Sequence, residues 1–200
     1  MQELRQQFRA LRGSLSSAER QQAMHAVAGR VSVLPIFANA IRIAGYWACN
    51  GELDPAPLLE RAWAMNQQVY LPVLVDTPQE SLQFAPYHPG SRLRRNCFNI
   101  PEPDVSATEW LPPVALDLVL TPLVAFDLAG TRLGMGGGFY DRSFAFLKDA
   151  RYRGHRPFLL GLAYEVQKAA ALVRQHWDVP LDGIATEAAL YWFPERDRAG

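Results

Sequence analysis

Residues 121–142 read TPLVAFDLAGTRLGMGGGFYDR and contain the glycine-rich part of the chain. An apolar run from Leu116 to Leu120 precedes it and has the length and composition of a buried strand. The segment Ser143 to Lys148 follows it and is expected to form a short helix. A glycine-rich turn between a strand and a helix exposes backbone N–H groups at the positive end of the helix, and its glycines permit positive φ angles. Such a turn is a physical site for an anion, most often phosphate.

The glycine cluster, Gly134 to Gly138, is neither of the two common phosphate loops. The sequence contains no Gly-Lys-Ser/Thr, and the pattern Gly-x-Gly-x-x-Gly would need a glycine at Phe139. The flanking residues supply other chemistry, because Arg132 can pair with phosphate oxygens and Asp141 can hold Mg²⁺ against them. A flexible turn with a surface arginine and a helix-capping aspartate explains the same residues equally well, since glycines chiefly punctuate structure.

Length and composition limit the class of protein. The 200 residues suit one α/β domain over residues 1–200. The 20 Lys+Arg residues balance the 20 Asp+Glu residues, so the chain has no net positive charge that would attract nucleic acid or an anionic membrane. The N-terminus lacks the apolar core of a signal peptide, and no window is apolar enough to cross a membrane. Cys49 and Cys97 offer neither metal-binding spacing nor a disulfide framework, which predicts free thiols in a reducing cytoplasm.

Helical and extended patterns alternate along the chain. Helices are expected over Gln2–Arg12, from the Ser16–Glu19 capping box to Pro35, from Asp54 to Met65, and over Gln167–Trp177. Strands are expected over 41–47, 69–74, 82–87, 114–120, 157–163 and 190–193, with Pro72 suggesting an edge strand or an irregularity. A turn is expected at 76–80 and a frayed tail at 195–200. This alternation predicts a single three-layer α/β domain, Rossmann-like, whose mixed, mostly parallel sheet carries helices on both faces. Ligands should bind beyond the carboxyl ends of its strands.

The motif around the glycine cluster resembles the signature of the 5-formyltetrahydrofolate cyclo-ligase (5,10-methenyltetrahydrofolate synthetase) family. The matching pattern is Pro-Leu-Val-Ala-Phe-Asp at 122–127, followed by Gly130-x-Arg-Leu-Gly-x-Gly-x-Gly138 and then Phe-Tyr-Asp141. Weaker similarities, such as Val-x-Leu-Pro at 69–72 and Asn-Ile-Pro-Glu-Pro at 99–103, extend the resemblance over almost the whole chain. It implies ATP-dependent conversion of 5-formyltetrahydrofolate to 5,10-methenyltetrahydrofolate, with Mg²⁺ as the cofactor.

The resemblance implies an ATP site built on the glycine cluster. It assigns ATP contacts to Arg5, Arg132, Leu133, Gly134, Met135, Gly136, Gly137, Gly138, Phe139 and Tyr140. Arg132 and Tyr140 are the expected catalytic residues. The residues alone favour a solvated basic face for Arg5 and Arg9, and the resemblance revises this for Arg5. Two lysines common in the family fall on Met1 and Gly137, a loss of charge that is expected to tune affinity.

The resemblance also implies a metal site and a folate site. Asp141 and Asp178 align with the family's Mg²⁺ positions. The positions that align with folate contacts are Trp47, Glu52, Met135, Gly136, Gly137, Gly138 and Phe139. A carboxylate at Glu52 suits the N–H donor edge of a pterin, and Trp47 supplies an aromatic wall. Without the resemblance, Glu52 would be an ordinary loop acid.

Two alternatives to the enzyme remain open. The chain could be a non-catalytic relative that binds folate or nucleotide, or a regulatory partner of a protein or an RNA, although balanced charge and the lack of an RNA-binding motif count against RNA. The expected partners are small-molecule substrates, with no nucleic acid and no membrane, for a cytoplasmic monomer or weak homodimer. The basic segment Arg92–Arg95 is expected to be an exposed loop, and contact with substrate carboxylates is the alternative.

Overall fold

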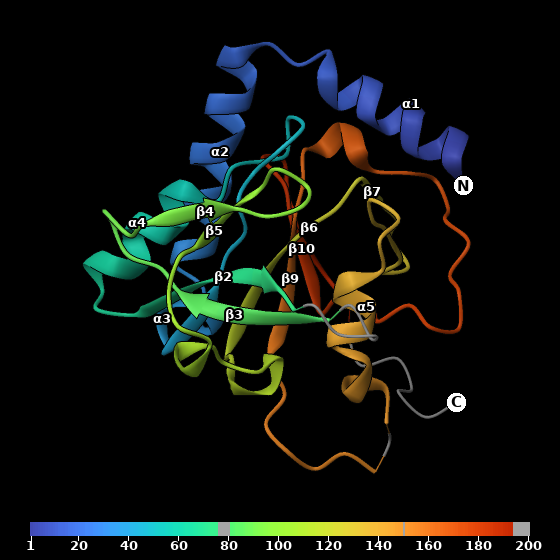
Figure 1. Ribbon diagram of the computed structural model, residues 1–200. Coiled ribbons are helices and arrows are strands. Elements are labelled where there is room, and N and C mark those ends of the chain that lie inside the picture. Colours follow the sequence, from blue (N-terminus) through green and yellow to red (C-terminus); the bar gives the residue numbers. More distant parts are fainter. Residues whose placement is uncertain (76–80, 150, 194–200) are drawn as a thin grey trace.

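A seven-stranded sheet forms the centre of the computed structural model, which describes residues 1–75, 81–149 and 151–193 (Figure 1). In spatial order its strands are β11 (Leu190–Trp192), β10 (Gly183–Ala185), β9 (Phe158–Leu162), β6 (Leu118–Pro122), β1 (Arg42–Ala44), β2 (Gln68–Leu74) and β3 (Leu82–Pro86). Neighbours from β10 to β2 run parallel, while β11 and β3 pair antiparallel at the two edges. The predicted α/β class with a mixed, mostly parallel sheet is therefore confirmed.

Three helices cover one face of the sheet: α2 (Ser17–Ser32), α3 (Pro35–Ala38) and α4 (Ala56–Ala64). α2 begins at the predicted capping box, in which the Ser16 hydroxyl accepts from the Glu19 N–H and the Glu19 carboxylate accepts from the Ser16 N–H. Pro35 opens α3 instead of closing α2, because its fixed φ suits the first turn of a helix. Side chains such as Val27 and Leu58 then bury this layer against the strands.

The opposite face is covered by shorter elements. α5 (Phe139–Ser143) is followed by a 3-10 turn, η3 (Ala145–Lys148), and their Phe144 and Leu147 pack in one core cluster with Val119 of β6. The helix expected over 143–148 is therefore divided, and its first part begins earlier, at Phe139. Figure 1 shows α5 on the side of the sheet opposite to α2 and α4.

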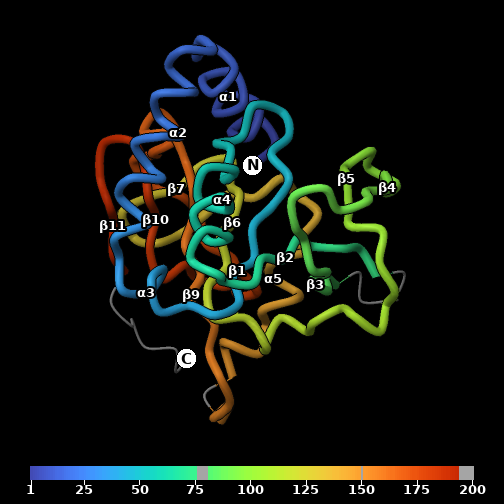
Figure 2. Tube along the Cα trace, turned by 90° about the vertical axis from the view of Figure 1, so that its left-hand side faces the viewer, coloured from blue at the N-terminus to red at the C-terminus, as the bar shows by residue number. Residues whose placement is uncertain are grey.

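The first helix, α1 (Gln2–Gly13), lies across the end of the sheet at which β6 leads into a small hairpin (Figures 1 and 2). That hairpin consists of β7 (Ala125–Phe126) and β8 (Arg132–Leu133). Phe8 of α1 packs in a third core cluster with Val124, Ala125 and Leu133. This packing fixes the rotation of α1, and it turns one row of α1 arginines toward the segment that follows β8.

The helix expected over 167–177 is wrong. A 3-10 turn, η4 (Glu165–Gln167), is followed by irregular backbone, and the Ala169 N–H donates to a carbonyl of β7 at 2.7 Å. The buried Gln167 amide donates to the carbonyls of Leu123 and Val124 at 2.8 and 2.9 Å. Hydrogen bonds to a distant segment thus replace the helical ladder, which an amphipathic spacing alone could not foresee.

The edge position suggested by Pro72 is also wrong, because β2 lies between β1 and β3. The pairing with β1 ends where Ala44 faces Tyr70, so no strand needs an N–H from Pro72 on that side. On the other side Pro72 faces Phe84, whose N–H and carbonyl bond to Leu111. Proline is tolerated here because no ladder hydrogen bond is lost.

A second hairpin, formed by β4 (Leu93–Arg95) and β5 (Pro101–Pro103), was not expected from the sequence and stands apart from the main sheet in Figure 2. Its Glu102 is buried and accepts from the Leu74 N–H at 2.9 Å, which attaches the hairpin to the end of β2.

Two further 3-10 turns are η1 (Ala107–Glu109) and η2 (Pro113–Ala115). Because η2 occupies residues 113–115, the strand that was expected to begin at residue 114 begins at Leu118. The turn expected at 76–80 and the tail at 195–200 lie outside the described residues. Within the described ranges, every helix is too short or too polar to cross a bilayer.

Candidate active site

The glycine loop, residues 134–138, connects β8 to α5 at the end of the sheet crossed by α1. Gly136 has a φ of 111° and Gly138 a φ of 66°, values that side chains rarely adopt. The expected need for glycine is therefore met at these two positions. α5 has only five residues, so its dipole is weaker than that of the helix the anion argument assumed. An anion here would depend on loop N–H groups and on nearby arginines.

Arg132 and Asp141 lie at the two ends of this loop and form an ion pair, with 2.5 Å between Nη2 and Oδ1. The Arg132 side chain is 5% exposed, and its Nη1 donates to the Val179 carbonyl. The Asp141 Oδ1 atom also accepts from the Val179 N–H at 3.0 Å. The loop is thus closed by an ion pair, and both partners hold the backbone of Val179.

The contact at Val179 brings Asp178 near Asp141, as a shared metal site would require. Asp178 Oδ2 accepts from the Gln175 N–H at 2.8 Å. The second oxygen of each aspartate, Asp141 Oδ2 and Asp178 Oδ1, has no hydrogen-bond partner among the described residues. Two such carboxylates fit Mg²⁺, which takes one or two carboxylates and completes its shell with water and phosphate oxygens. No group of three or more potential metal ligands occurs in the described parts of the chain.

α1 presents two arginines to the glycine loop. Arg5 Nε donates to the Gly134 carbonyl at 2.9 Å, and a Cβ at Gly136 would lie 3.6 Å from the Arg5 guanidinium carbon. Arg5 therefore lies at the loop, as the family resemblance implied. Arg9, which was expected to be solvated, donates to the Met135 sulfur at 3.4 Å. The structure adds a second arginine to this side of the loop.

Glu52 lies in the loop after β1 and is 8% exposed. Its Oε2 accepts from the Cys49 N–H at 3.1 Å and from the Cys49 thiol at 3.5 Å. Burial raises the pKa of the Glu52 carboxyl, while Cys49 and the charge of Arg12 act in the opposite direction. Burial and the Glu52 charge together raise the pKa of the Cys49 thiol to about 11, so Cys49 remains a neutral donor.

Sequence reasoning missed Arg12, which is 1% exposed. Its Nη2 donates to the Asn50 carbonyl at 2.8 Å and its Nη1 to the Leu123 carbonyl at 3.4 Å. Burial lowers the pKa of this guanidinium and the Glu52 charge raises it. Arg5, Arg9 and Arg12 follow a four-then-three spacing on α1, so helical periodicity could have placed all three on one face.

Tyr140 lies in α5, directly after the glycine loop. Its hydroxyl is buried and has no hydrogen-bond partner among the described residues. Burial, followed by the Glu52 charge, raises the pKa of this phenol, which therefore stays protonated and can donate. Its ring stacks on Phe144, with centroids 6.2 Å apart. A buried phenol with an unused proton is well suited to donate to a bound ligand.

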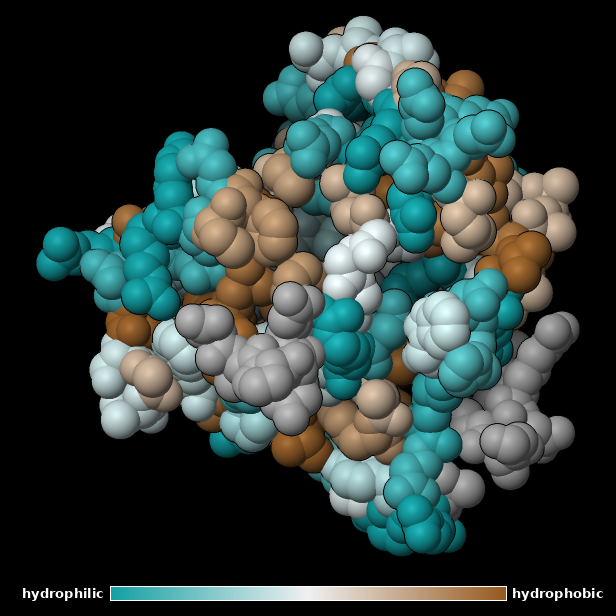
Figure 3. All heavy atoms as spheres, turned by 45° about the vertical axis from the view of Figure 1, so that its right-hand side comes forward, coloured by the Kyte–Doolittle hydropathy of each residue, from teal (hydrophilic) through white to brown (hydrophobic). Residues whose placement is uncertain are grey.

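Trp47 borders a cavity of about 250 Å³. The other lining residues are Tyr46, Ala48, Asp54, Ala56, Leu59, Glu60, Trp63, Leu71 and Tyr87. Neither Glu52 nor the glycine loop is among the lining residues, so this cavity does not bring Trp47 and Glu52 together. Figure 3, which brings the right-hand side of Figure 1 forward, shows a central hollow with hydrophilic and apolar surface close together around it.

Phe98, a further residue missed from the sequence, places the β4–β5 hairpin against the glycine loop. Its ring meets the Phe139 ring edge-on, with centroids 5.9 Å apart, although Phe98 is 58% exposed. The Phe139 ring also leaves no room for a side chain at Gly137, because a Cβ there would lie 2.7 Å from the ring. A lysine at position 137 would require the Phe139 ring to move.

Comparisons with known proteins agree with this architecture. Residues 1–187 match the model of the 5-formyltetrahydrofolate cyclo-ligase family. The 5-formyltetrahydrofolate cyclo-ligase of Haemophilus influenzae is 39% identical over 180 residues, covering 90% of this chain and 94% of its own, and that of Escherichia coli K12 is 39% identical over 184 residues, covering 92% and 98%. The NMR structure of Aquifex aeolicus 5,10-methenyltetrahydrofolate synthetase has a TM-score of 0.80 at 31% identity, covering 98% of this chain and 93% of that one.

Proposed function

Because this chain belongs to the 5-formyltetrahydrofolate cyclo-ligase family, we propose that it converts 5-formyltetrahydrofolate and ATP to 5,10-methenyltetrahydrofolate, ADP and phosphate. The main structural support for the proposal is that three segments distant in the sequence lie together: α1, the glycine loop and the loop that contains Glu52. Arg5 of α1 bonds to the glycine loop, and Arg12 of α1 bonds to the loop that carries Glu52. Two substrates could therefore be held side by side.

The reaction must turn the formyl oxygen into a leaving group. Transfer of the γ-phosphoryl group of ATP to that oxygen would release ADP. Attack of N10 on the formyl carbon, with loss of the N10 proton to solvent or phosphate, followed by departure of the oxygen with phosphate, would close the methenyl ring. The protein's part would be to align the two substrates and to stabilise charge on the phosphoryl group.

Arg5, Arg132 and the N–H groups of residues 133–140 would bind ATP. Arg132 would meet the phosphoryl group as part of its ion pair with Asp141, so its planar guanidinium is already oriented. The Tyr140 hydroxyl would donate a hydrogen bond to the formyl oxygen or to phosphate, which gives its buried proton a partner. Asp141 and Asp178 would hold Mg²⁺, and the ion would supply neutralisation of phosphate charge.

Glu52 would accept from the 2-amino and N3 groups of the pterin, and Trp47 would form an aromatic wall beside it. Arg12 would keep the Glu52 loop in place through Asn50. The strip from Met135 to Phe139 would separate folate from ATP. We further expect a cytoplasmic monomer or weak homodimer that acts on small molecules and binds neither nucleic acid nor membrane. The alternative is a relative that binds these ligands without turnover.

The test is the absorbance of the methenyl product after 5-formyltetrahydrofolate and ATP are added, with and without Mg²⁺. Product formation that requires both ATP and Mg²⁺ is the expected result. Binding of folate and ATP by calorimetry without any methenyl absorbance would instead support the non-catalytic alternative.

A further inference from the structure

The β4–β5 hairpin separates the arginines that look equivalent in the sequence. Arg94 lies directly opposite Glu102 in the antiparallel pair, and directly opposite residues project from the same face. Glu102 points into the molecule, because its Oε1 accepts from the Leu74 N–H and from the Asn96 side chain, at 2.9 and 2.8 Å. Arg94 therefore projects from the face of the hairpin that is turned to the end of β2. Its neighbour Arg95 projects from the other face, where it donates to the Asn99 carbonyl at 2.8 Å.

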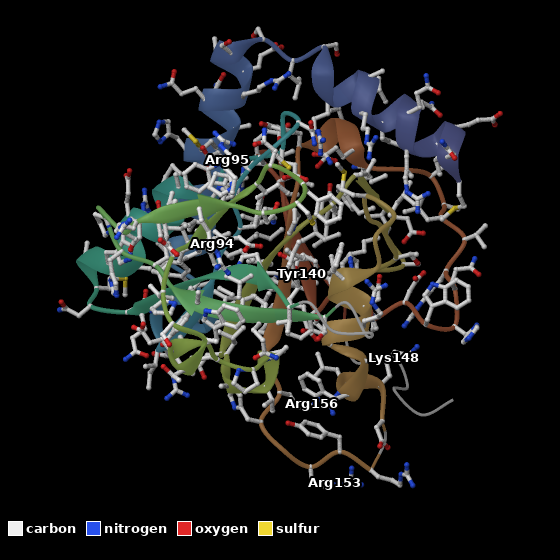
Figure 4. The ribbon with its side chains drawn as sticks, viewed as in Figure 1. Arg94, Arg95, Tyr140, Lys148, Arg153 and Arg156 are labelled. Carbon is white, nitrogen blue, oxygen red and sulfur yellow. The ribbon has the colours of Figure 1, made fainter. Side chains whose placement is uncertain are left out.

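Figure 4 shows this difference. Arg94 lies on the side of β4 that faces the sheet, the same side as Tyr140, and Arg95 lies on the opposite side. The tip of this hairpin also reaches the glycine loop, where Phe98 contacts Phe139. The hairpin thus extends from the loop that is proposed to bind folate to the carboxyl end of β2, and Arg94 lies between these two attachments.

The Arg94 charge is not used by the protein. Within residues 1–75, 81–149 and 151–193, the Arg94 side chain has neither a hydrogen-bond partner nor an ion-pair partner, and it is exposed. The Glu102 carboxylate opposite it already accepts two N–H groups and lies beyond ion-pair distance. An exposed arginine that faces a binding site is suited to a carboxylate ligand, which its planar fork can hold with two hydrogen bonds.

We propose that Arg94 binds a carboxylate of the glutamyl group of the folate substrate and is a specificity-determining residue for that group. This inference rests on the proposed function, because the glutamyl group is the anionic end of 5-formyltetrahydrofolate, remote from the pterin. With the pterin at Glu52, the substrate would pass Phe139 and Phe98 and bring its carboxylates to the inner face of β4. Arg95, on the outer face, has no part in this contact.

The test compares two substrates in three proteins: the wild type, Arg94→Ala and Arg95→Ala. The substrates are 5-formyltetrahydrofolate and 5-formyltetrahydropteroate, which lacks the glutamyl group. We expect Arg94→Ala to raise the KM of the full substrate roughly tenfold and to leave kcat nearly unchanged, because a contact remote from the reacting atoms contributes uniform binding. The truncated substrate should have the same KM in the wild type and in Arg94→Ala, and Arg95→Ala should behave as the wild type with both.

An equal effect of Arg94→Ala on both substrates would overturn the inference, since it would indicate a structural role for Arg94 in the hairpin. An equal effect of Arg95→Ala on the full substrate would also overturn it, because general surface charge would then explain the result. Calorimetric titration of the same ligands in the same variants separates this inference from the proposed function. A wild type that binds both ligands but forms no methenyl product would refute turnover, while the ratio of dissociation constants would still test Arg94.

Discussion

Arg132 and Asp141 are paired across the glycine loop, with 2.5 Å between their charged groups, although Arg132 was expected to bind phosphate oxygens and Asp141 to hold Mg²⁺. Both also bond to Val179, one to its carbonyl and the other to its N–H. The pair therefore joins the glycine loop to the segment that carries Asp178. Any ligand that binds this loop meets charges whose positions are already fixed, which reduces the reorganisation needed during reaction.

This pairing changes what is expected of Asp141→Asn. The substitution removes a hard oxygen ligand and also leaves the nearly buried Arg132 without its anion. We expect turnover to fall at least a hundredfold and the free energy of unfolding to fall by about 1–3 kcal/mol. Steady-state rates and urea denaturation, measured on the same preparation, check both effects.

Asp178→Asn is the matched control for this loss of stability. Asp178 accepts only a backbone N–H, which an asparagine oxygen can also do, so stability should change by less than about 0.5 kcal/mol. Turnover should fall and the Mg²⁺ concentration for half-maximal activity should rise. Near-normal activity in both variants would remove the two aspartates from the metal site.

The raised pKa of Glu52 leads us to expect that folate binding depends on pH. Burial raises the pKa of this carboxyl above its ordinary value of 4.5, so folate affinity should fall as the pH drops through a value above 4.5, by up to about tenfold per pH unit. A raised pKa stabilises the protonated form in the folded protein. The stabilisation of the folded protein by protonated Glu52 is therefore complete below the ordinary pKa and is lost as the pH rises through the raised pKa of the folded protein. Weaker folate binding in mild acid thus cannot result from unfolding caused by this group.

Glu52→Gln tests this origin. Folate binding should be weak at every pH and should lose the acidic decline, while ATP affinity stays near that of the wild type. Calorimetric titration of each ligand from pH 5 to pH 8 provides both measurements. If the variant loses affinity for folate and ATP to the same extent, the Glu52 loop serves folding and not recognition.

Arg12→Met should disconnect α1 from the Glu52 loop. The Asn50 carbonyl would lose the Arg12 donor and the Leu123 carbonyl would keep only the donor from Gln167, so we expect a loss of about 1–3 kcal/mol in unfolding free energy. Folate affinity should fall with it, because the loop position depends on Asn50. Arg9→Met removes an exposed arginine of the same helix face and is the control. Equal stability and equal folate affinity in the two variants would argue against this role of Arg12.

Labelled substrate tests how the formyl oxygen leaves. ¹⁸O in the formyl group of the substrate should appear in inorganic phosphate, because the proposed transfer makes that oxygen part of the phosphate. Arg132→Lys, which keeps a cation beside Asp141, should slow turnover without changing the fate of the label, since Arg132 stabilises charge and does not choose the nucleophile. Mass spectrometry of the phosphate gives the answer. Label in water with unlabelled phosphate would exclude the phosphorylated formyl intermediate.

The sequence by itself determined the parts that depend on local pattern. Mostly apolar runs predicted the inner parallel strands β6 and β9, because both faces of such strands are buried, whereas the inner strand β10 was not expected. The Ser16–Glu19 capping box predicted the start of α2, because that pairing involves only residues three apart. Glycine at positions 136 and 138 predicted positive φ angles for the same local reason. The family motif brought Arg5 and the glycine loop into one site.

Features that depend on partners far away in the chain could not be predicted from local pattern. The segment after Gln167 has a helical spacing of apolar residues, yet its N–H groups and its glutamine bond to β7 and to residues 123 and 124, which no local pattern encodes. Arg94 and Arg95 differ in sequence only by order, and they differ in function as proposed only because Glu102 anchors one face of their hairpin. Arg132 and Asp141 face each other because the loop between them folds back. Local sequence fixes which conformations a segment favours, whereas long-range hydrogen bonds and ion pairs select among them.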